Sequence, residues 1–513
     1  MGSAGQGHKL LRPRPKHRHR GRAIEQALYR HTVNTLLALL PLLLVIALLA
    51  SGRASALAAG LAGFAATLAV AVLAFGASGA VLAREIPAGL WLAWHVVAII
   101  GAGMFFHRCL QRRGHSATGV APASATPGLA ATPRRLWPVC FLLAPFAESV
   151  TGFGIGYIIA LGALTRLGVG GVPALLLGLY SQSLVPWGAL AIGTTVGATI
   201  AGLTPSQLGL ASAVLQAPIH LFYLLLYWRF ARETGIAVPA AQKLDDALWT
   251  AVLLALVWLV NRHSDAEIAG AAATAFLLAL RFWRDERPDL AALGAALHRN
   301  APYVALTVAL CATRLVPPLR DLLRPLWALK PYDNQPAFAP LYAPGFWLIS
   351  IGLVVLFTAR ASIGRAVADT ARGAWRSCAV TLAFVVMAEL YVGSGMAQQI
   401  AEALRAAAGR SAAIGVPLFA GVGGFLTGGG SAGNAMLMPM VTALARAVAV
   451  DPAWIAAVQN SVCTNLTMLS PIRVSMGIGL LGHLVSDSEL YRRAWPLALP
   501  PLIVGVAAIA LLL

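Results

Sequence analysis

The sequence predicts an all-α polytopic membrane protein with about 12 to 14 transmembrane helices, in two inverted repeats that each contain a re-entrant or broken helix. Three observations lead to this fold class. Of the 513 residues, 58% are apolar and 11% are charged, and the mean hydropathy is +0.75. Apolar runs long enough to cross a bilayer recur along the chain. Two of these runs are interrupted in the middle by glycine-rich segments. The composition excludes an ordinary soluble enzyme and a disordered chain.

The charge balance is strongly basic, with 38 Lys and Arg against 19 Asp and Glu and a formal net charge of +19. Most of these basic residues lie in short gaps between apolar runs, as in the cytoplasmic loops of multispan membrane proteins. We interpret residues 1–32, rich in Arg and His, as a basic cytoplasmic tail that contacts anionic membrane lipid. The N-terminus is therefore expected in the cytoplasm, and the protein in the cell inner (cytoplasmic) membrane. A nucleic-acid-binding arm is the weaker alternative, because aromatic residues do not interleave with the charges.

The N-terminal half divides into three regions. Residues 33–107 hold the first three expected spans, and residues 108–136 are a polar loop rich in Pro, Ala and Thr. Residues 137–230 are the core of the first repeat. The apolar runs of this half lie at 34–50, 55–75, 88–106, 137–167, 172–203 and 208–230.

The C-terminal half divides into two regions. Residues 231–372 carry middle spans and a Pro-rich loop, and residues 373–513 are the core of the second repeat. The apolar runs of this half lie at 244–260, 266–282, 301–314, 346–358, 375–390, 414–444, 452–469, 472–485 and 495–513.

Two interrupted runs are the most informative segments of the chain. The first, at 146–157, reads FAESVTGFGIGY and predicts a broken helix at 148–156. The second, at 421–436, reads GVGGFLTGGGSAGNAM and predicts a broken helix at 423–435. Non-helical backbone at membrane depth is tolerated only where it is buried in protein or lines a wet cavity. One such break in each half is the pattern of a binding site between inverted repeats in transporters.

A sequence repeat supports this interpretation. An offset of 279 residues relates Phe146 to Phe425, Gly154 to Gly433 and Pro173 to Pro452. The same offset relates the polar pair Ser181-Gln182 to Asn460-Ser461. Identities are few, and the evidence is the common order: apolar arm, glycine turn, apolar arm, and a Pro-led span with polar residues inside.

Two carboxylates lie well inside the apolar runs, Glu148 and Glu389. Because a charge at bilayer depth is costly unless it is paired, hydrated or protonated, both are of interest. Glu148 adjoins the first break and is interpreted as a proton-coupling carboxylate or as a cap on the exposed amides of a broken helix; the two roles can coexist. Glu389 either lines the same cavity or pairs with a neighbouring helix, and the second interpretation is favoured.

Arg473 is the one arginine expected near a membrane-buried break, in the segment TMLSPIRVSMG. Its guanidinium suits a carboxylate held through two parallel hydrogen bonds. The alternative is that Arg473 extends to the membrane interface. His95 and His220 lie in apolar runs and are more simply packed interhelical histidines than proton relays.

The remaining site residues are glycines, hydroxyls and amides at the breaks and in the polar spans, where their density exceeds that of ordinary spans. The residues expected to bind substrate are Gly152, Phe153, Gly154, Ser181, Gln182, Thr427, Gly428, Ser431, Asn434, Asn460, Ser470 and Arg473, with Glu148 for proton coupling. No cofactor or metal is expected, because the five cysteines are scattered and show no metal-ligand spacing.

At these residues the chain resembles the L-lactate permease family of bacterial monocarboxylate:proton symporters. Residues 148–154, Glu-Ser-Val-Thr-Gly-Phe-Gly, are similar to the family's Glu-Gly-Ala-Ala-Gly-Phe-Gly signature. Phe425-Leu426-Thr427-Gly428, with Asn434-Ala435 after it, is similar to the second signature. Shorter motifs match in the family's order at Ser394-Gly395-Met396 and Met468-Leu469-Ser470-Pro471, and Trp187-Gly188-Ala189 falls where the family has Phe-Gly-Ala. The resemblance covers residues 136–230 and 384–513.

The chain departs from the family pattern at five positions. In the second break this chain has Gly430 where the family has an acidic residue. It also has Thr467 in place of a Lys, Ile472 in place of a Gln, Ser181 in place of an Asn and Gly156 in place of a Pro.

We therefore expect a secondary transporter that moves a small monocarboxylate together with protons, and the resemblance implies lactate or glycolate. The expected partners are this substrate, protons and membrane lipid, with no nucleic acid, and the sequence is compatible with a homo-oligomer. Another organic anion with different coupling is the alternative. A channel would lack substrate saturation and dependence on a proton gradient. A membrane-embedded enzyme is disfavoured, because no nucleophile–base motif or metal-ligand cluster is found in the sequence.

Overall fold

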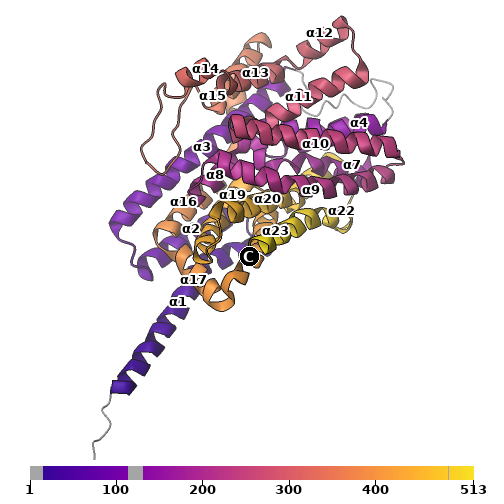
Figure 1. The fold of residues 1–513 in the computed structure, drawn as a ribbon. Helices are drawn as coiled ribbons and strands as arrows, with labels where there is room; N and C mark the ends of the chain where they lie inside the picture. Colours follow the sequence, from indigo (N-terminus) through magenta and orange to yellow (C-terminus); the bar gives the residue numbers. More distant parts are fainter. Residues whose placement is uncertain (1–15, 114–130, 483–484) are drawn as a thin grey trace, which may run out of the picture.

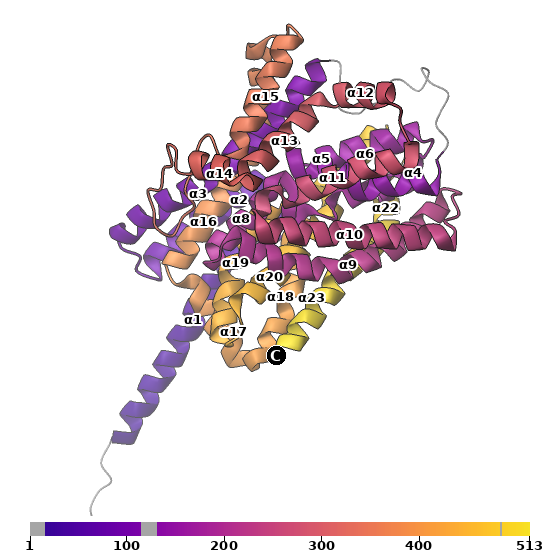
Figure 2. The same ribbon diagram turned by 45° about the horizontal axis from the view of Figure 1, so that its top comes forward.

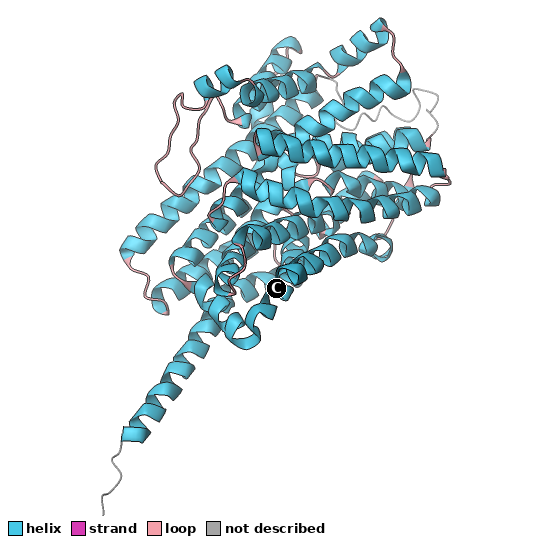
Figure 3. Ribbon diagram, viewed as in Figure 1, coloured by secondary structure: helices cyan, strands magenta, loops and turns pink. Residues whose placement is uncertain are grey.

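The computed structural model describes residues 16–113, 131–482 and 485–513, and in these ranges the chain is almost entirely helical (Figures 1 and 3). The described residues contain no β-strand, only an isolated bridge between Leu329 and Phe338. Nine helices there are long and apolar enough to cross a membrane, or up to eleven if each bent helix pair is one span. This number is below the expected 12 to 14 because length and composition do not register spans that the breaks divide into short helices.

The N-terminal group packs on one long helix of the second half. Its helices are α1 (Lys16–Ala50), α2 (Ala56–Leu73) and α3 (Gly79–Arg112). Helix α16 (Ile363–Gly393) runs antiparallel to α3, because Arg112 pairs with Asp369 at one end and Gly393 lies against Glu85 at the other. Gly89 permits this close approach, since a Cβ there would lie 2.8 Å from Cα of Val386.

The first repeat core consists of a helical hairpin, a broken helix and a long span. The hairpin is α5 (Ala144–Thr151) and α6 (Ile155–Arg166), preceded by α4 (Pro133–Pro138) and the π-helical turn η1 (Val139–Leu143). The broken helix is α7 (Gly171–Gly178), the 3₁₀ turns η2 (Leu179–Gln182) and η3 (Val185–Trp187), and α8 (Gly188–Ala201), with a bend of 52°. The span is α9 (Pro205–Glu233).

The second repeat core has the same order of elements. Its hairpin is α18 (Val416–Thr427) and α19 (Gly430–Ala447), preceded by α17 (Met396–Ala408) and η4 (Gly409–Gly415). Its broken helix is α20 (Pro452–Leu466), η5 (Thr467–Leu469) and α21 (Pro471–Leu480). The final span is α22 (Asp487–Ala494), η6 (Trp495–Ala498) and α23 (Leu499–Leu512). The second hairpin is interrupted only at residues 428–429, a shorter break than the expected 423–435, because Gly433 and Asn434 are already helical.

The middle helices lie along one flank of these cores (Figure 2). They are α10 (Ala240–His263), α11 (Ala266–Glu286), α12 (Leu290–Arg299), α13 (Ala301–Leu315), α14 (Pro317–Leu323) and α15 (Pro344–Thr358). Helices α10 and α11 are tied together at one end by Arg281, which donates to Asp245 at 3.0 Å and stacks over Trp137 and Trp249. The Pro-rich loop follows α14, and Pro317 and Pro318 belong to that helix.

The helix ends define two opposite ends of the bundle. The first, which we call the arginine-rich end, holds the last turns of α3, α9 and α11, the starts of α4, α10 and α16, and α22. Four ion pairs join these segments: Arg112–Asp369, Arg135–Glu286, Arg281–Asp245 and Arg493–Glu233. The tail end carries the start of α1, α17 and the C-terminus (Figure 1), where Gln399 donates to the His31 carbonyl and Arg410 to that of Leu512. Helix α1 therefore begins at the end of the bundle opposite to the arginine-rich loops.

The two hairpins enter the bundle from these opposite ends. Hairpin α5–α6 follows α4 at the arginine-rich end. Hairpin α18–α19 follows η4 at the tail end and returns there, where Arg446 donates to the Ala201 carbonyl at 3.1 Å. Opposite entry is the arrangement that inverted repeats require.

Candidate functional site

The first break is a turn made by three consecutive residues with left-handed backbone. Gly152, Phe153 and Gly154 have φ values of 68°, 56° and 85°. Left-handed geometry is easy for glycine and strained for phenylalanine, so Phe153 is held there by its surroundings. The turn packs on a second left-handed stretch, Ala189–Ala191 at the start of α8. A Cβ on Gly152 would lie 2.5 Å from that of Ala189, so only glycine fits at this contact.

Glu148 closes the hairpin by capping the helix that follows it. Its carboxylate accepts hydrogen bonds from the amide of Gly154 at 3.0 and 3.1 Å and from that of Gly156 at 3.0 Å. These amides begin α6 and have no partner within their own helix, so the carboxylate satisfies them and complements the helix dipole. The side chain is 3% exposed. The capping interpretation of Glu148 is thus observed directly.

Arg473 brings a positive charge to the same place from the second repeat. Its Nη2 lies 3.5 Å from Oε1 of Glu148, and the residue is 7% exposed. The guanidinium lies against the break, since a Cβ added to Gly154 would collide with Nη1. Its Nε is buried and has no hydrogen-bond partner. The structure therefore buries Arg473 at the first break instead of extending it to an interface.

The second break lies on the other side of the start of α21, the helix that carries Arg473. Gly428, with φ of 64°, faces Ser470, whose Oγ would be 2.9 Å from an added Cβ. Ser470 in turn caps α21 by accepting from the Arg473 amide at 3.3 Å. The start of α21 therefore contacts both breaks. Residue Gly193 of α8 closes the other side, because its added Cβ would lie 3.1 Å from the Gly430 carbonyl carbon.

The helix that leaves the second break is not capped by an acid. Thr427 donates to the Gly423 carbonyl at 2.7 Å, and its hydroxyl lies 3.5 Å from the Gly429 amide. Helix α19 begins with no side-chain cap. Its first amides therefore have no side-chain partner, and helix N-termini of this kind bind anionic groups at breaks in transporters.

A chain of buried amides links the two repeats behind the breaks. Asn434 donates to the Gly193 carbonyl at 3.0 Å and to Asn460 at 2.8 Å, and Asn460 donates to Thr194 and Ser212 at 3.0 Å. Asn465 and Gln216 extend the chain with a bond of 2.9 Å. Several polar atoms beside it are buried without a partner: Oε1 of Gln182, Oγ of Ser183, Oδ1 of Asn434, both amide atoms of Gln459, Oγ of Ser461 and Oδ1 of Asn465. This part of the interior has unused hydrogen-bonding capacity.

We call the region formed by the two breaks and the amide chain the polar centre. The structure brings the expected site residues together there. Gly152, Phe153, Gly154, Glu148 and Arg473 form its first break, and Thr427, Gly428, Ser431 and Ser470 lie at its second break. Asn434 and Asn460 belong to the amide chain, and Ser181 with Gln182 form the buried turn η2 in the bend of the first broken helix.

Glu389 and the histidines lie elsewhere. Glu389 accepts from Gln335 of the Pro-rich loop at 3.0 Å. His95 and His220 each bond the carbonyl one helical turn earlier, at 3.0 and 2.9 Å.

Sequence reasoning missed several contributors, among them Thr194 of α8, which accepts from Asn460. Gln216 and Ser212 lie on α9 and bind the amide chain, and single polar residues in the apolar run 208–230 were their only signal. Gly156 was noted only as a departure, yet its added Cβ would lie 2.5 Å from the Ala144 carbonyl oxygen and 2.7 Å from Cβ of Glu148. Only glycine lets α5 and α6 approach this closely.

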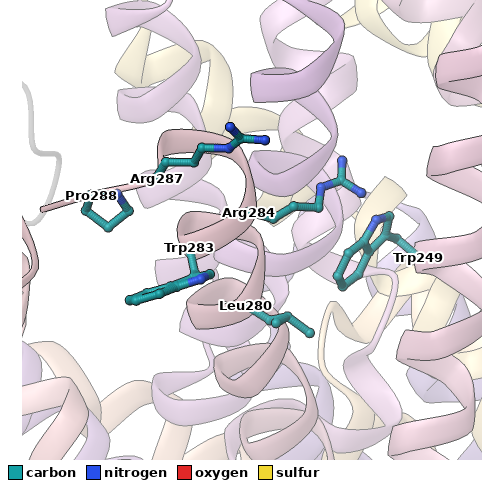
Figure 4. Close-up of a pocket in the computed structure, with 6 residues that line it drawn as sticks. All are labelled: Trp249, Leu280, Trp283, Arg284, Arg287 and Pro288. Atoms are coloured by element: carbon teal, nitrogen blue, oxygen red, sulfur yellow. The ribbon is translucent and has the colours of Figure 1, made fainter.

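A separate hollow lies at the arginine-rich end, away from the polar centre. This pocket of 640 Å³ is lined by Trp249 of α10, Leu280, Trp283 and Arg284 of α11, and the following Arg287 and Pro288 (Figure 4). Arg284 is already paired there with Asp245 at 2.7 Å.

These features define a class of protein. Many apolar helices surround a polar centre built from two hairpins of opposite entry and two broken helices, which is the architecture of secondary transporters. The family model described as L-lactate permease matches residues 34–255 and 329–513, most of the chain. The chain belongs to the L-lactate permease family and is a multi-pass membrane transport protein. Comparison with individual curated proteins gives no match.

Proposed function

We propose that this protein moves a small monocarboxylate of the lactate or glycolate kind across the cell inner membrane by proton symport, with the polar centre as its binding site. One observation carries the proposal: Arg473 is buried at the first break, with an unpartnered Nε, in a chain of the L-lactate permease family. Permease membership supports a transporter and not an enzyme.

The donors at the polar centre suit an anion. An anion inside a membrane protein needs a cation or free helix amides, because no bulk water solvates it. Arg473 supplies the cation, and the starts of α6 and α19 supply amides. The hydroxyl of a 2-hydroxy acid then has the neighbouring amide and hydroxyl side chains as partners.

Each site residue takes a part in this proposal. Arg473 binds the carboxylate, and Glu148 takes up the coupled proton while it also caps α6. The backbone at Gly152, Phe153, Gly154 and Gly428, and the polar groups of Ser181, Gln182, Thr427, Ser431, Asn434, Asn460 and Ser470, line the path or hold the substrate.

The orientation follows from the positive-inside rule applied to the folded chain. Basic residues gather at the ends of α3, α9 and α11 and at the starts of α4 and α16, all at the arginine-rich end. We propose that this end faces the cytoplasm. Helix α1 then begins on the outer face, against the expectation from the basic N-terminal residues taken alone.

Uptake into proteoliposomes tests the function. Protein purified and reconstituted into vesicles should accumulate radiolabelled lactate or glycolate when an inward proton gradient is imposed, and a proton ionophore should abolish the accumulation. Saturation by substrate separates a carrier from a channel. If accumulation does not depend on the proton gradient but depends on the gradient of another ion, the protein is a carboxylate transporter with different coupling. This is the alternative that the sequence leaves open.

A further inference from the structure

We propose that Glu148 is a built-in occupant of the substrate's anion site. Its carboxylate rests on the donors that the substrate carboxylate takes, and protonation of Glu148 vacates them. The inference rests on the proposed function and deepens it, because it links the proton and the anion through competition at a single place.

The donors around Glu148 form a carboxylate site. The amides of Gly154 and Gly156 and the Nη2 of Arg473 point to its two oxygens, at 3.0, 3.0 and 3.5 Å. All three groups donate hydrogen bonds to the carboxylate of Glu148. A lactate-type carboxylate has the same pair of oxygens at the same separation, so the same donors fit it.

The site also has a donor that Glu148 does not use. The Nε of Arg473 is buried without a partner, and the residue is more than nine-tenths buried. The single contact from Nη2 to Glu148, at 3.5 Å, is the upper limit of a hydrogen bond. A carboxylate bound side-on would engage Nε together with Nη2, the two-bond geometry that guanidinium groups favour. The guanidinium is therefore better matched by an incoming carboxylate than by Glu148.

Two ionised carboxylates on these donors exclude each other, because like charges a few ångströms apart repel strongly in a poorly solvated interior. Arg473 is the one charged side chain that pairs with Glu148 in the part of the chain that the structure describes. The elements that pack on α5 also bring other titratable groups: His107 and Cys109 of α3, Cys140 of η1, Tyr157 of α6, Tyr180 of η2, and Glu267 and Arg281 of α11.

Binding then takes up one proton with each anion. A proton from water neutralises Glu148, the side chain gives up its hold on the amides and Arg473, and the substrate carboxylate replaces it. On the other side of the membrane the substrate leaves, Glu148 loses its proton to water, and its carboxylate returns to the donors.

The repeat offers a competing location for the anion. The offset of 279 residues places Thr427 of the second hairpin where the first has Glu148, so the start of α19 has no internal competitor. An anion bound only at α19 would be insensitive to Glu148. This difference makes the proposal testable.

The test is direct binding of radiolabelled lactate to the full chain in nanodiscs, with pH as the variable. For wild-type protein the apparent Kd should rise by up to about tenfold per pH unit at alkaline pH, as expected for one linked proton. For Glu148→Gln the Kd should be independent of pH and, at the alkaline end, at least about tenfold tighter than that of wild type. Glu148→Asp keeps the charge and should keep the pH dependence. Glu389→Gln removes a buried carboxylate outside the polar centre and should bind as wild type does.

Two results would overturn the inference while leaving carboxylate transport intact. One is a Glu148→Gln protein that keeps the wild-type slope of Kd against pH. The other is a Glu148→Gln protein that unfolds at the wild-type temperature but binds lactate more weakly at every pH, because Glu148 would then support the site instead of competing for it. If Glu148→Gln fails to fold, loss of the pH slope in Glu148→Asp would equally contradict competition. Wild-type protein that binds and transports neither lactate nor glycolate would instead refute the proposed function.

Discussion

Arg473 of α21 and Thr194 of α8 occupy equivalent places in the two broken helices, 279 residues apart. Arg473 lies against Gly154 of the first hairpin, whereas Thr194 accepts from Asn460 of the second repeat at 3.0 Å. The same offset pairs Glu148 with Thr427. One half of the polar centre is therefore charged and the other half is neutral, an asymmetry that suits a 2-hydroxy acid, in which a neutral hydroxyl lies on the carbon next to the carboxylate.

Replacing Arg473 with Ala should weaken substrate binding in both proton-driven uptake and exchange. Loss of a charge-assisted hydrogen bond is worth about 1.5–3 kcal/mol, which corresponds to a KM higher by roughly one to two orders of magnitude. Initial rates in proteoliposomes measure the change. Arg320→Ala, an exposed arginine of the Pro-rich side, is the matched control and should transport normally. A normal KM for Arg473→Ala would mean that backbone amides and hydroxyls hold the substrate alone.

Glu148→Gln should abolish the response of uptake to a proton gradient, while exchange of internal for external carboxylate persists. Exchange moves no net proton, so it does not require a group that titrates in each cycle. Paired uptake and exchange measurements on the same vesicles check this result. Full proton-driven accumulation by this variant would show that the carboxylate is only a helix cap.

Gly156→Ala should force the first hairpin open. The new Cβ would lie 2.5 Å from the Ala144 carbonyl oxygen, and overpacking of this kind destabilises by about 1–3 kcal/mol. The midpoint of thermal unfolding in detergent should fall, and transport with it. Gly364→Ala adds the same methyl group where nothing lies within 4 Å, so it should leave both unchanged.

Asn460→Leu should destabilise the protein more than Gln459→Met does. Asn460 bonds Asn434, Thr194 and Ser212, so its loss leaves buried polar groups without partners, at about 1–3 kcal/mol. The side-chain amide of Gln459 is equally buried but makes no hydrogen bond, so an apolar side chain of similar size removes none. Thermal unfolding of the two variants gives the comparison, and equal losses would argue that the amide chain contributes nothing beyond packing.

Labelling from the outside tests the orientation. In a background without the five native cysteines, Glu25→Cys, exposed on α1 before its candidate span, should react with a membrane-impermeant maleimide on intact cells, because α1 begins at the tail end. Ser362→Cys, exposed at the start of α16 and at the arginine-rich end, should react only after permeabilisation. The opposite pattern would put the basic tail in the cytoplasm.

Composition and local pattern were enough to predict the helical membrane fold and the two breaks in its helices. The breaks are visible in the sequence because glycine clusters stand out against uniform Ala, Leu and Val. Glu148 and Arg473 are visible because charges are rare at that depth. The contact between them was not predicted, since it joins residues 325 positions apart.

Other features depend on three-dimensional packing that no local pattern encodes. The left-handed stretch Ala189–Ala191 consists of ordinary apolar residues. It packs directly against Gly152 of the first hairpin, a contact that no local pattern indicates. The requirement for Gly156 comes from the distance between two helices. The number of segments that cross the membrane is ambiguous in the sequence, because interrupted apolar runs divide some spans into short helices.

The meeting of the two repeats at the polar centre has a consequence for biogenesis. The ribosome delivers Glu148 and Thr194 long before Arg473 and Asn460, with which they pair in the folded protein. Until the last third of the chain is inserted, Glu148 has only the amides of its own hairpin as partners, and Gly193 and Ser212 lack the Asn434 and Asn460 side chains that bind them. The polar centre must form late and all at once. An N-terminal fragment ending near residue 233 should therefore be degraded when it is produced alone and protected when the remainder of the chain is co-expressed.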